Sequence, residues 1–120
     1  MQEAIPYNTV VLVRAKPDAR AQVLVRRAVE QARGSCLVFF HGPGVAMSAS
    51  DADDWSGLVS QLNERRDNRT DLALRVCSAA WQRHGSERLP SGFAIDSLIG
   101  FWHAASLSRR LISIGQSDAD

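Results

Sequence analysis

The sequence predicts an α/β fold, a single domain built on an open, mostly parallel β-sheet with helices on both faces. Three short apolar runs, at residues 9–13, 36–40 and 72–77, are typical of strands buried on both faces. Segments with helical spacing alternate with them, and this alternation implies parallel strands joined by right-handed crossovers. With 120 residues, 45% of them hydrophobic and 22% charged, the chain is long enough for one core, so we expect one domain over residues 1–120.

The first strand, residues 9–13, is followed by an amphipathic helix. Pro17 excludes strand pairing and Asp18 is able to cap the helix that follows. The helix ends before Gly34, a residue typical of helix C-termini. Its apolar residues recur at helical spacing: Ala21, Leu24, Val25, Ala28 and Ala32.

The second strand, residues 36–40, leads into a glycine-containing turn at residues 41–45. Asp53 or Asp54 then caps a predicted helix in which Trp55, Leu58, Val59 and Leu62 repeat at helical spacing, with Trp55 in the core. The third strand ends at Cys77, and the short helix after it stops at Gly85.

The C-terminal third predicts one more helix and a closing strand. No element is assigned to residues 89–95. Asp96 or Ser97 caps a helix in which Leu98, Phe101, Trp102 and Ala105 line one face, and residues 110–114 supply the strand. We expect Phe101 and Trp102 in the core rather than in a subunit interface, and frayed termini at 1–7 and 116–120.

Charge and targeting features argue against several classes of partner. The net charge of +1 comes from 14 basic and 13 acidic residues spread along the chain, so we expect neither direct nucleic-acid binding nor attraction to a membrane surface. The N-terminal residues have no signal-peptide pattern, and no apolar run approaches the ~20 residues of a membrane span. We therefore expect a cytoplasmic protein in which Cys36 and Cys77 stay reduced.

Metal and nucleotide chemistry are not expected either. The turn at residues 42–44 lacks the spacing of a phosphate-binding loop, and Lys16 is the only lysine. Zinc sites need ligand pairs at close spacing. The candidate ligands contain no such pair: Cys36, His41, Cys77, His84 and His103.

Cys77 is the predicted functional centre because it stands where a buried strand ends and a helix begins. A thiolate at a helix N-terminus is stabilised by the helix dipole and by free amide donors, which would make Cys77 a nucleophile. The alternative is that Cys77 only fills space in the core. His84 lies two helical turns further on, roughly 10 Å away, so His41 is the better neighbour, unless His41 is simply an exposed loop histidine.

The chemistry open to Cys77 is that of a single thiol. No Cys-x-x-Cys motif accompanies it, which argues against thioredoxin-type dithiol exchange. A lone activated thiolate suits a sulfur carrier: it takes the outer sulfur of a donor persulfide and yields it to an acceptor thiolate.

Several pieces of the chain, in order and spacing, resemble the DsrE/TusD family of sulfur-relay sulfurtransferases over residues 36 to 114. They are Phe39-Phe40 with Gly44-Val45, Val76-Cys77-Ser78-Ala79-Ala80 with Arg83 and Gly85, Gly92-Phe93, Leu98, and Ala105-Ser106-Leu107. The resemblance implies a flavodoxin-like domain in which Cys77 matches the persulfide-carrying cysteine, in a homo-oligomer or a hetero-oligomer with DsrE-, DsrF- or DsrH-like subunits.

The resulting expectation is a sulfurtransferase without cofactor or metal, exchanging sulfur with TusA-, TusE- or DsrC-like carrier proteins in tRNA thiolation or sulfur-oxidation trafficking. Around Cys77 we expect His41 as a polar neighbour, Gly44 as a loop hinge and Ser78 as an amide donor, while Cys36 serves packing. Two alternatives stay open: a non-catalytic subunit in which Cys77 is a remnant, and a flavodoxin-like domain that binds a small molecule through the 41–48 loop.

Overall fold

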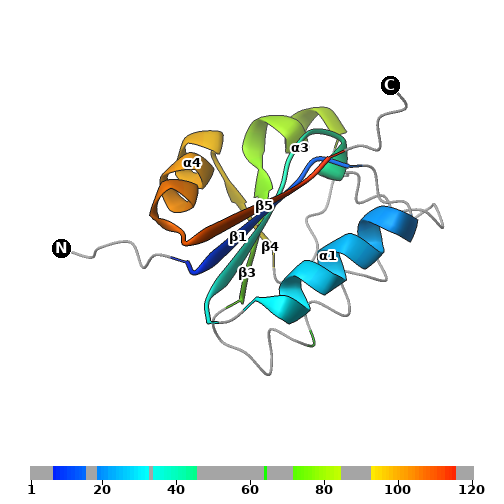
Figure 1. The fold of residues 1–120 in the computed structure, drawn as a ribbon. Helices are drawn as coiled ribbons and strands as arrows, with labels where there is room; N and C mark the ends of the chain where they lie inside the picture. The colour runs from blue at the N-terminus through cyan, green and yellow to red at the C-terminus, as the bar shows by residue number, and fades with distance from the viewer. Residues whose placement is uncertain are drawn as a thin grey trace.

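Five parallel strands form one sheet in the computed structural model, which describes residues 7–15, 19–32, 34–45, 64, 72–84 and 93–115 (Figure 1). Their order across the sheet is β4-β3-β2-β1-β5, and every neighbouring pair is parallel. The strands are β1 (Thr9–Val13), β2 (Cys36–Phe40), β3 (Leu72–Cys77), β4 (Phe93–Asp96) and β5 (Arg110–Ile114). The α/β sheet predicted from the sequence is confirmed.

The order of the strands changes direction once. From β1 to β4 each new strand adds to the same edge, and the last connection then returns across the sheet to set β5 beside β1. The turning point between β1 and β5 is the place at whose carboxyl end open α/β sheets usually form their ligand crevice.

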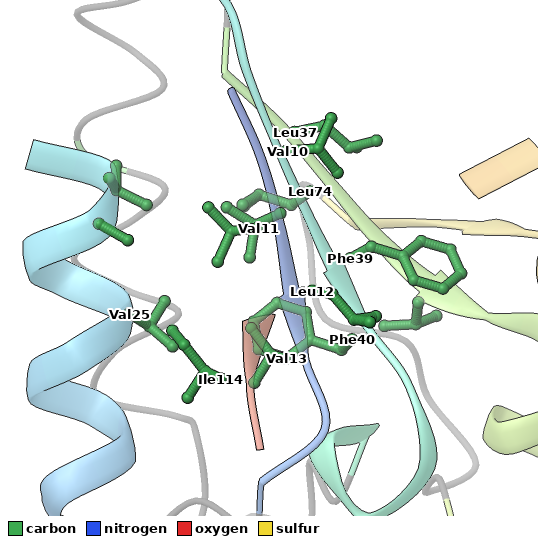
Figure 2. Packing of buried hydrophobic residues seen from close by; sticks show 14 of the residues in the cluster. Val10, Val11, Leu12, Val13, Val25, Leu37, Phe39, Phe40, Leu74 and Ile114 are labelled. Atoms are coloured by element: carbon green, nitrogen blue, oxygen red, sulfur yellow. The ribbon is translucent and has the colours of Figure 1, made fainter. Parts of the chain in front are cut away.

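Helices cover both faces of the sheet, as predicted. The described helices are α1 (Ala19–Gln31), α3 (Ser78–His84), α4 (Leu98–Leu107) and a 3₁₀ turn, η1 (Gly42–Val45). Val25 of α1 packs near Val13 and Ile114 (Figure 2), whereas Phe101 of α4 stacks on Phe39 with ring centroids 4.8 Å apart. Leu12, the register partner of Phe39, precedes Val13, and successive side chains of a strand point to opposite faces, so α1 and α4 lie on opposite sides.

The core follows the register of the central strands. Every residue of β1 and of β2 is buried, the pattern of strands covered on both faces. Gly34, after α1, has φ of 75°, the left-handed conformation that ends helices at glycine. Tyr7, expected in a frayed terminus, packs against this core instead.

Two predictions for the C-terminal part are corrected. Residues 93–96 form β4, although no element was assigned to residues 89–95, because Phe93 to Asp96 pair with Leu74 to Cys77 of β3 in a run only four residues long. Trp102 is 54% exposed rather than in the core. Phe101 takes the position facing Phe39, and the next residue of a helix points about 100° away from it.

Other predictions lie outside the described residues or concern single segments. The helix over Trp55 to Leu62, and with it the predicted burial of Trp55, falls outside the described part, as do residues 1–6 and 116–120. Of the two predicted caps, Asp96 and Ser97, it is Ser97 that caps α4, its Oγ accepting a hydrogen bond from the Gly100 amide at 3.0 Å. None of the described helices is long and apolar enough to cross a membrane.

Replacing Phe101 tests the packing of α4 on the sheet. Phe101 is fully buried against Phe39, so Phe101→Ala should lower the free energy of unfolding by about 3–5 kcal/mol through lost contacts and a cavity. Trp102→Ala, which truncates an exposed neighbour on the same helix, is the control and should cost clearly less. Urea denaturation measures both, and equal losses would contradict this account of the packing.

Candidate functional site

Four polar or nucleophilic residues come together at the carboxyl edge of the sheet. Cys77 is paired in register with Asp96 of β4. Phe40 is paired with Val76 and with Val13, so the residues that follow, His41 and Arg14, continue the same row. Neighbouring strands lie about 4.8 Å apart, which sets Arg14, His41, Cys77 and Asp96 side by side in that order. We call these four residues the edge row.

Backbone hydrogen bonds show that the ladder continues into the edge row. The amide of His41 donates to the carbonyl of Val13 at 2.9 Å, and the amide of Arg14 donates to the carbonyl of Ile114 at 2.8 Å. His41 and Arg14 therefore keep the alignment of β2 and β1 for one residue beyond the strands.

Cys77 lies where the sequence places it, at the end of β3 directly before α3. Its side chain, however, is only 1% exposed and belongs to the buried cluster. Val45 of η1 and Ala80 of α3 are buried in the same cluster, so the loop after β2 and the first turn of α3 close over this end of the sheet. The thiol of Cys77, which a sulfur carrier must present to a partner's thiol, is therefore closed off from solvent in this structure.

His41 is half-buried, and its Nδ1 is a buried atom with no hydrogen-bond partner. Burial is the larger cause that lowers the pKa of His41 below its ordinary value of 6.5, and the positive charge of Arg14 lowers it further. The imidazole is consequently neutral at pH 7, with one nitrogen able to accept a proton. His41 is thus not an ordinary exposed loop histidine.

The remaining predicted shell residues lie close to this edge. Gly44 is part of η1, and Ser78 is the half-buried first residue of α3. The left-handed backbone of the turn is at Gly42, with φ of 58°. A hinge at Gly44 and an amide donor at Ser78 remain predictions.

Asp96 holds the N-terminus of α4. Its Oδ1 accepts a hydrogen bond from the Ser97 amide at 2.7 Å, and a Cβ added to Gly100 would lie 2.6 Å from the same oxygen. A side chain at position 100 would therefore make the carboxylate of Asp96 shift. An acid at a helix N-terminus is favourable, since it faces the positive end of the helix dipole.

Arg14 and Asp96 are the edge-row residues that the sequence analysis did not assign to the site. The signal for Arg14 was present, because it directly follows an apolar strand run as His41 does. The signal for Asp96 was weaker, since β4 itself was not predicted. Cys36 stands at the start of β2, the opposite end of the sheet, which agrees with a packing role, and no disulfide joins it to Cys77.

The edge row contains a thiol, that of Cys77, and an imidazole, that of His41, which are groups used in thiol chemistry. No group of three or more His, Cys, Asp or Glu within the described ranges is placed to hold a metal ion. Cys77 and His41 are neighbours in the register of β3 and β2, although Nδ1 of His41 has no hydrogen-bond partner and so does not bind the thiol in this structure. The edge row therefore brings a thiol and an imidazole to neighbouring strand ends without joining them by a hydrogen bond.

Comparison with known proteins gives a fold. No protein-family model matches the chain, and no curated protein matches it in sequence. Among solved structures, the chain is similar to the YchN protein from E. coli, with a TM-score of 0.65 and 13% identity over 90% of this chain and 99% of that one. The similarity therefore extends over nearly the whole described fold, and at this identity it shows the fold alone.

The depressed pKa of His41 predicts a pH dependence of stability. The unfolded chain takes up a proton on His41 near pH 6.5 and the folded chain only at lower pH, so acidification below pH 6.5 favours unfolding. In urea titrations between pH 7.5 and 5.5, His41→Gln should lose less stability than the wild type. His103→Gln, at an exposed position away from the edge row, is the matched control. A His41→Gln profile parallel to that of the wild type would argue against the assignment.

Proposed function

We propose that this protein is a sulfur-relay sulfurtransferase that carries sulfane sulfur as a persulfide on Cys77. The observation that carries the proposal is the position of Cys77, at a strand-to-helix junction beside His41, in a fold shared with YchN, a DsrE-like protein. The resemblance of residues 36 to 114 to the DsrE/TusD family supports the same activity.

The proposed reaction has two displacement steps. The Cys77 thiolate attacks the outer sulfur of a donor persulfide, a new S–S bond forms, and the donor leaves as its thiolate. An acceptor thiolate then attacks the outer sulfur of the Cys77 persulfide, and Cys77 leaves as the thiolate. No net oxidation occurs, and the chain needs neither metal nor nucleotide for these steps.

His41 has the proton-accepting role in this proposal. Its neutral imidazole takes the proton of the Cys77 thiol as the donor sulfur approaches and returns it when the sulfur has been passed on. The positive charge of Arg14 helps to keep the resting imidazole neutral, and the same charge disfavours the imidazolium that forms when the proton is taken up. His41 would be a positioning and proton-transfer group, and sulfur itself would be held only by Cys77.

The burial of Cys77 means that sulfur transfer requires an opening. A thiol that is 1% exposed cannot meet a partner's thiol in line, so η1 or the first turn of α3 must move away. We propose that a TusA-, TusE- or DsrC-like carrier provides the binding energy for this movement, in the cytoplasm and in a homo- or hetero-oligomer. Gly42 and Gly44 in η1 are the residues best able to allow it.

Intact-mass measurement after incubation with a persulfide donor tests the activity. The wild type and Cys36→Ser should each gain one sulfur atom, removable by dithiothreitol, and Cys77→Ser should gain none. Cys36→Ser is the matched control, since it removes the other buried thiol at the opposite end of the sheet. Sulfur uptake by Cys77→Ser equal to that of the wild type would refute the role of Cys77.

The second candidate function is that of a non-catalytic subunit, favoured by the burial of Cys77 in the hydrophobic cluster. Thiol labelling separates the two. With 5,5′-dithiobis(2-nitrobenzoate), both cysteines should react slowly in the native protein, and in the relay proposal a carrier protein should accelerate Cys77 at least tenfold and leave Cys36 unchanged. Equal, slow labelling with every carrier tested, together with no sulfur uptake, would identify a structural subunit.

A further inference from the structure

A groove between α1 and the edge strand β5 is the feature of the fold that the proposed function does not use. It has a volume of about 590 Å³ and lies on the far side of β1 from β2 and β3. The described residues that line it are Arg20, Leu24, Arg27, Ala28, Gln31, Arg110, Ile112, Ser113, Ile114 and Gly115. We call it the α1–β5 groove.

The groove has an apolar floor and a strongly basic rim. Leu24, Ile112 and Ile114 supply the floor, whereas Arg20, Arg27 and Arg110 are exposed arginines, and none of the described residues of the lining is acidic. Three like charges at one groove repel each other, and an anionic ligand relieves this repulsion. The positive charge of the groove's rim therefore favours a negatively charged ligand.

The spacing of the arginines calls for an elongated ligand. Arg20 and Arg27 are seven residues apart on α1, which places them on one side of the helix about 10.5 Å apart along its axis. Charges spread along a ligand match this spacing better than a single phosphate or sulfate, which would draw both arginine side chains to one point. The groove instead suits a ligand that carries at least two negative charges along its length.

The backbone of β5 supplies the second half of the recognition. The Arg110 amide donates to Asn8 and the Ile114 carbonyl accepts from Arg14, so the backbone groups of Arg110 and Ile114 face β1. Because these groups alternate along a strand, those of Leu111 and Ser113 point to the open edge of the sheet. The edge offers two amide donors and two carbonyl acceptors, spread along a strand of roughly 17 Å.

We propose that the α1–β5 groove binds an extended acidic peptide segment of a partner protein, which adds to the sheet as a further strand beside β5. Its backbone pairs with Leu111 and Ser113, and its carboxylates meet Arg20, Arg27 and Arg110. A nucleic-acid strand would use the arginines but has no backbone amides to match the carbonyls of the edge strand. A peptide is the ligand that uses both features of the groove, and this inference does not depend on the chemistry of Cys77.

Fluorescence anisotropy with two blocked heptapeptides tests the proposal. The first alternates Asp and Val, and the second alternates Asn and Val. The acidic peptide should bind at least tenfold more tightly, with an affinity that falls as salt is added. Arg20→Gln and Arg27→Gln should each weaken binding about two- to fivefold. Arg83→Gln, an exposed arginine on α3 outside the groove, is the matched control and should bind as the wild type does.

The edge of β5 is tested separately. Ser113→Pro removes an amide that points to solvent, and proline is tolerated at such edge positions, so this variant should fold and lose binding. Should it not fold, hydrogen exchange of the wild type decides, because the amides of Leu111 and Ser113 should become protected when the acidic peptide is added. Equal binding of both peptides, an unchanged affinity in the arginine variants, unprotected amides, or displacement of the peptide by a single-stranded oligonucleotide would each overturn the proposal.

Discussion

The hydrogen-bonded register between parallel strands is the constraint on which the rest of this protein depends. Four residues that are far apart in the sequence become neighbours only because β1, β2, β3 and β4 end at the same level. Arg14 and His41 directly follow strands, whereas Cys77 and Asp96 are the last residues of theirs. The burial of the apolar strands therefore fixes where these four residues lie. A shift of one residue in any pair would turn that side chain to the other face.

Burial affects both His41 and Cys77 in the edge row, and the charge of Arg14 also acts on His41. Arg14 and burial both disfavour a charged His41, while Asp96 is held by the Ser97 amide at the N-terminus of α4. Cys77 lies between His41 and Asp96 and away from water. Burial protects a thiol from oxidation and from unspecific partners, at the cost of needing movement before transfer, and this links the proposed chemistry to partner binding.

The turning point of the sheet and the cysteine are separate places in this fold. The turning point lies between β1 and β5, where a Cβ added to Gly115 would lie 3.4 Å from Nη2 of Arg14, while Cys77 is two strands away on β3. Arg14 is therefore the end of the edge row next to the α1–β5 groove, which Gly115 lines. A peptide in this groove and a sulfur on Cys77 would occupy different ends of one row of strand termini.

The sequence by itself determined the strands 9–13, 36–40, 72–77 and 110–114, a helix cap at either Asp96 or Ser97, and the position of Cys77 before a helix, because apolar runs, caps and helix-ending glycines are local signals. Only the tertiary structure decided the strand order, the existence of β4, the row that joins Arg14 and Asp96 to His41 and Cys77, and the burial of the thiol. These properties depend on which distant segments lie side by side and cover one another. Even the contrast between buried Phe101 and exposed Trp102 depends on which of two adjacent rings meets Phe39, and no local pattern contains that information.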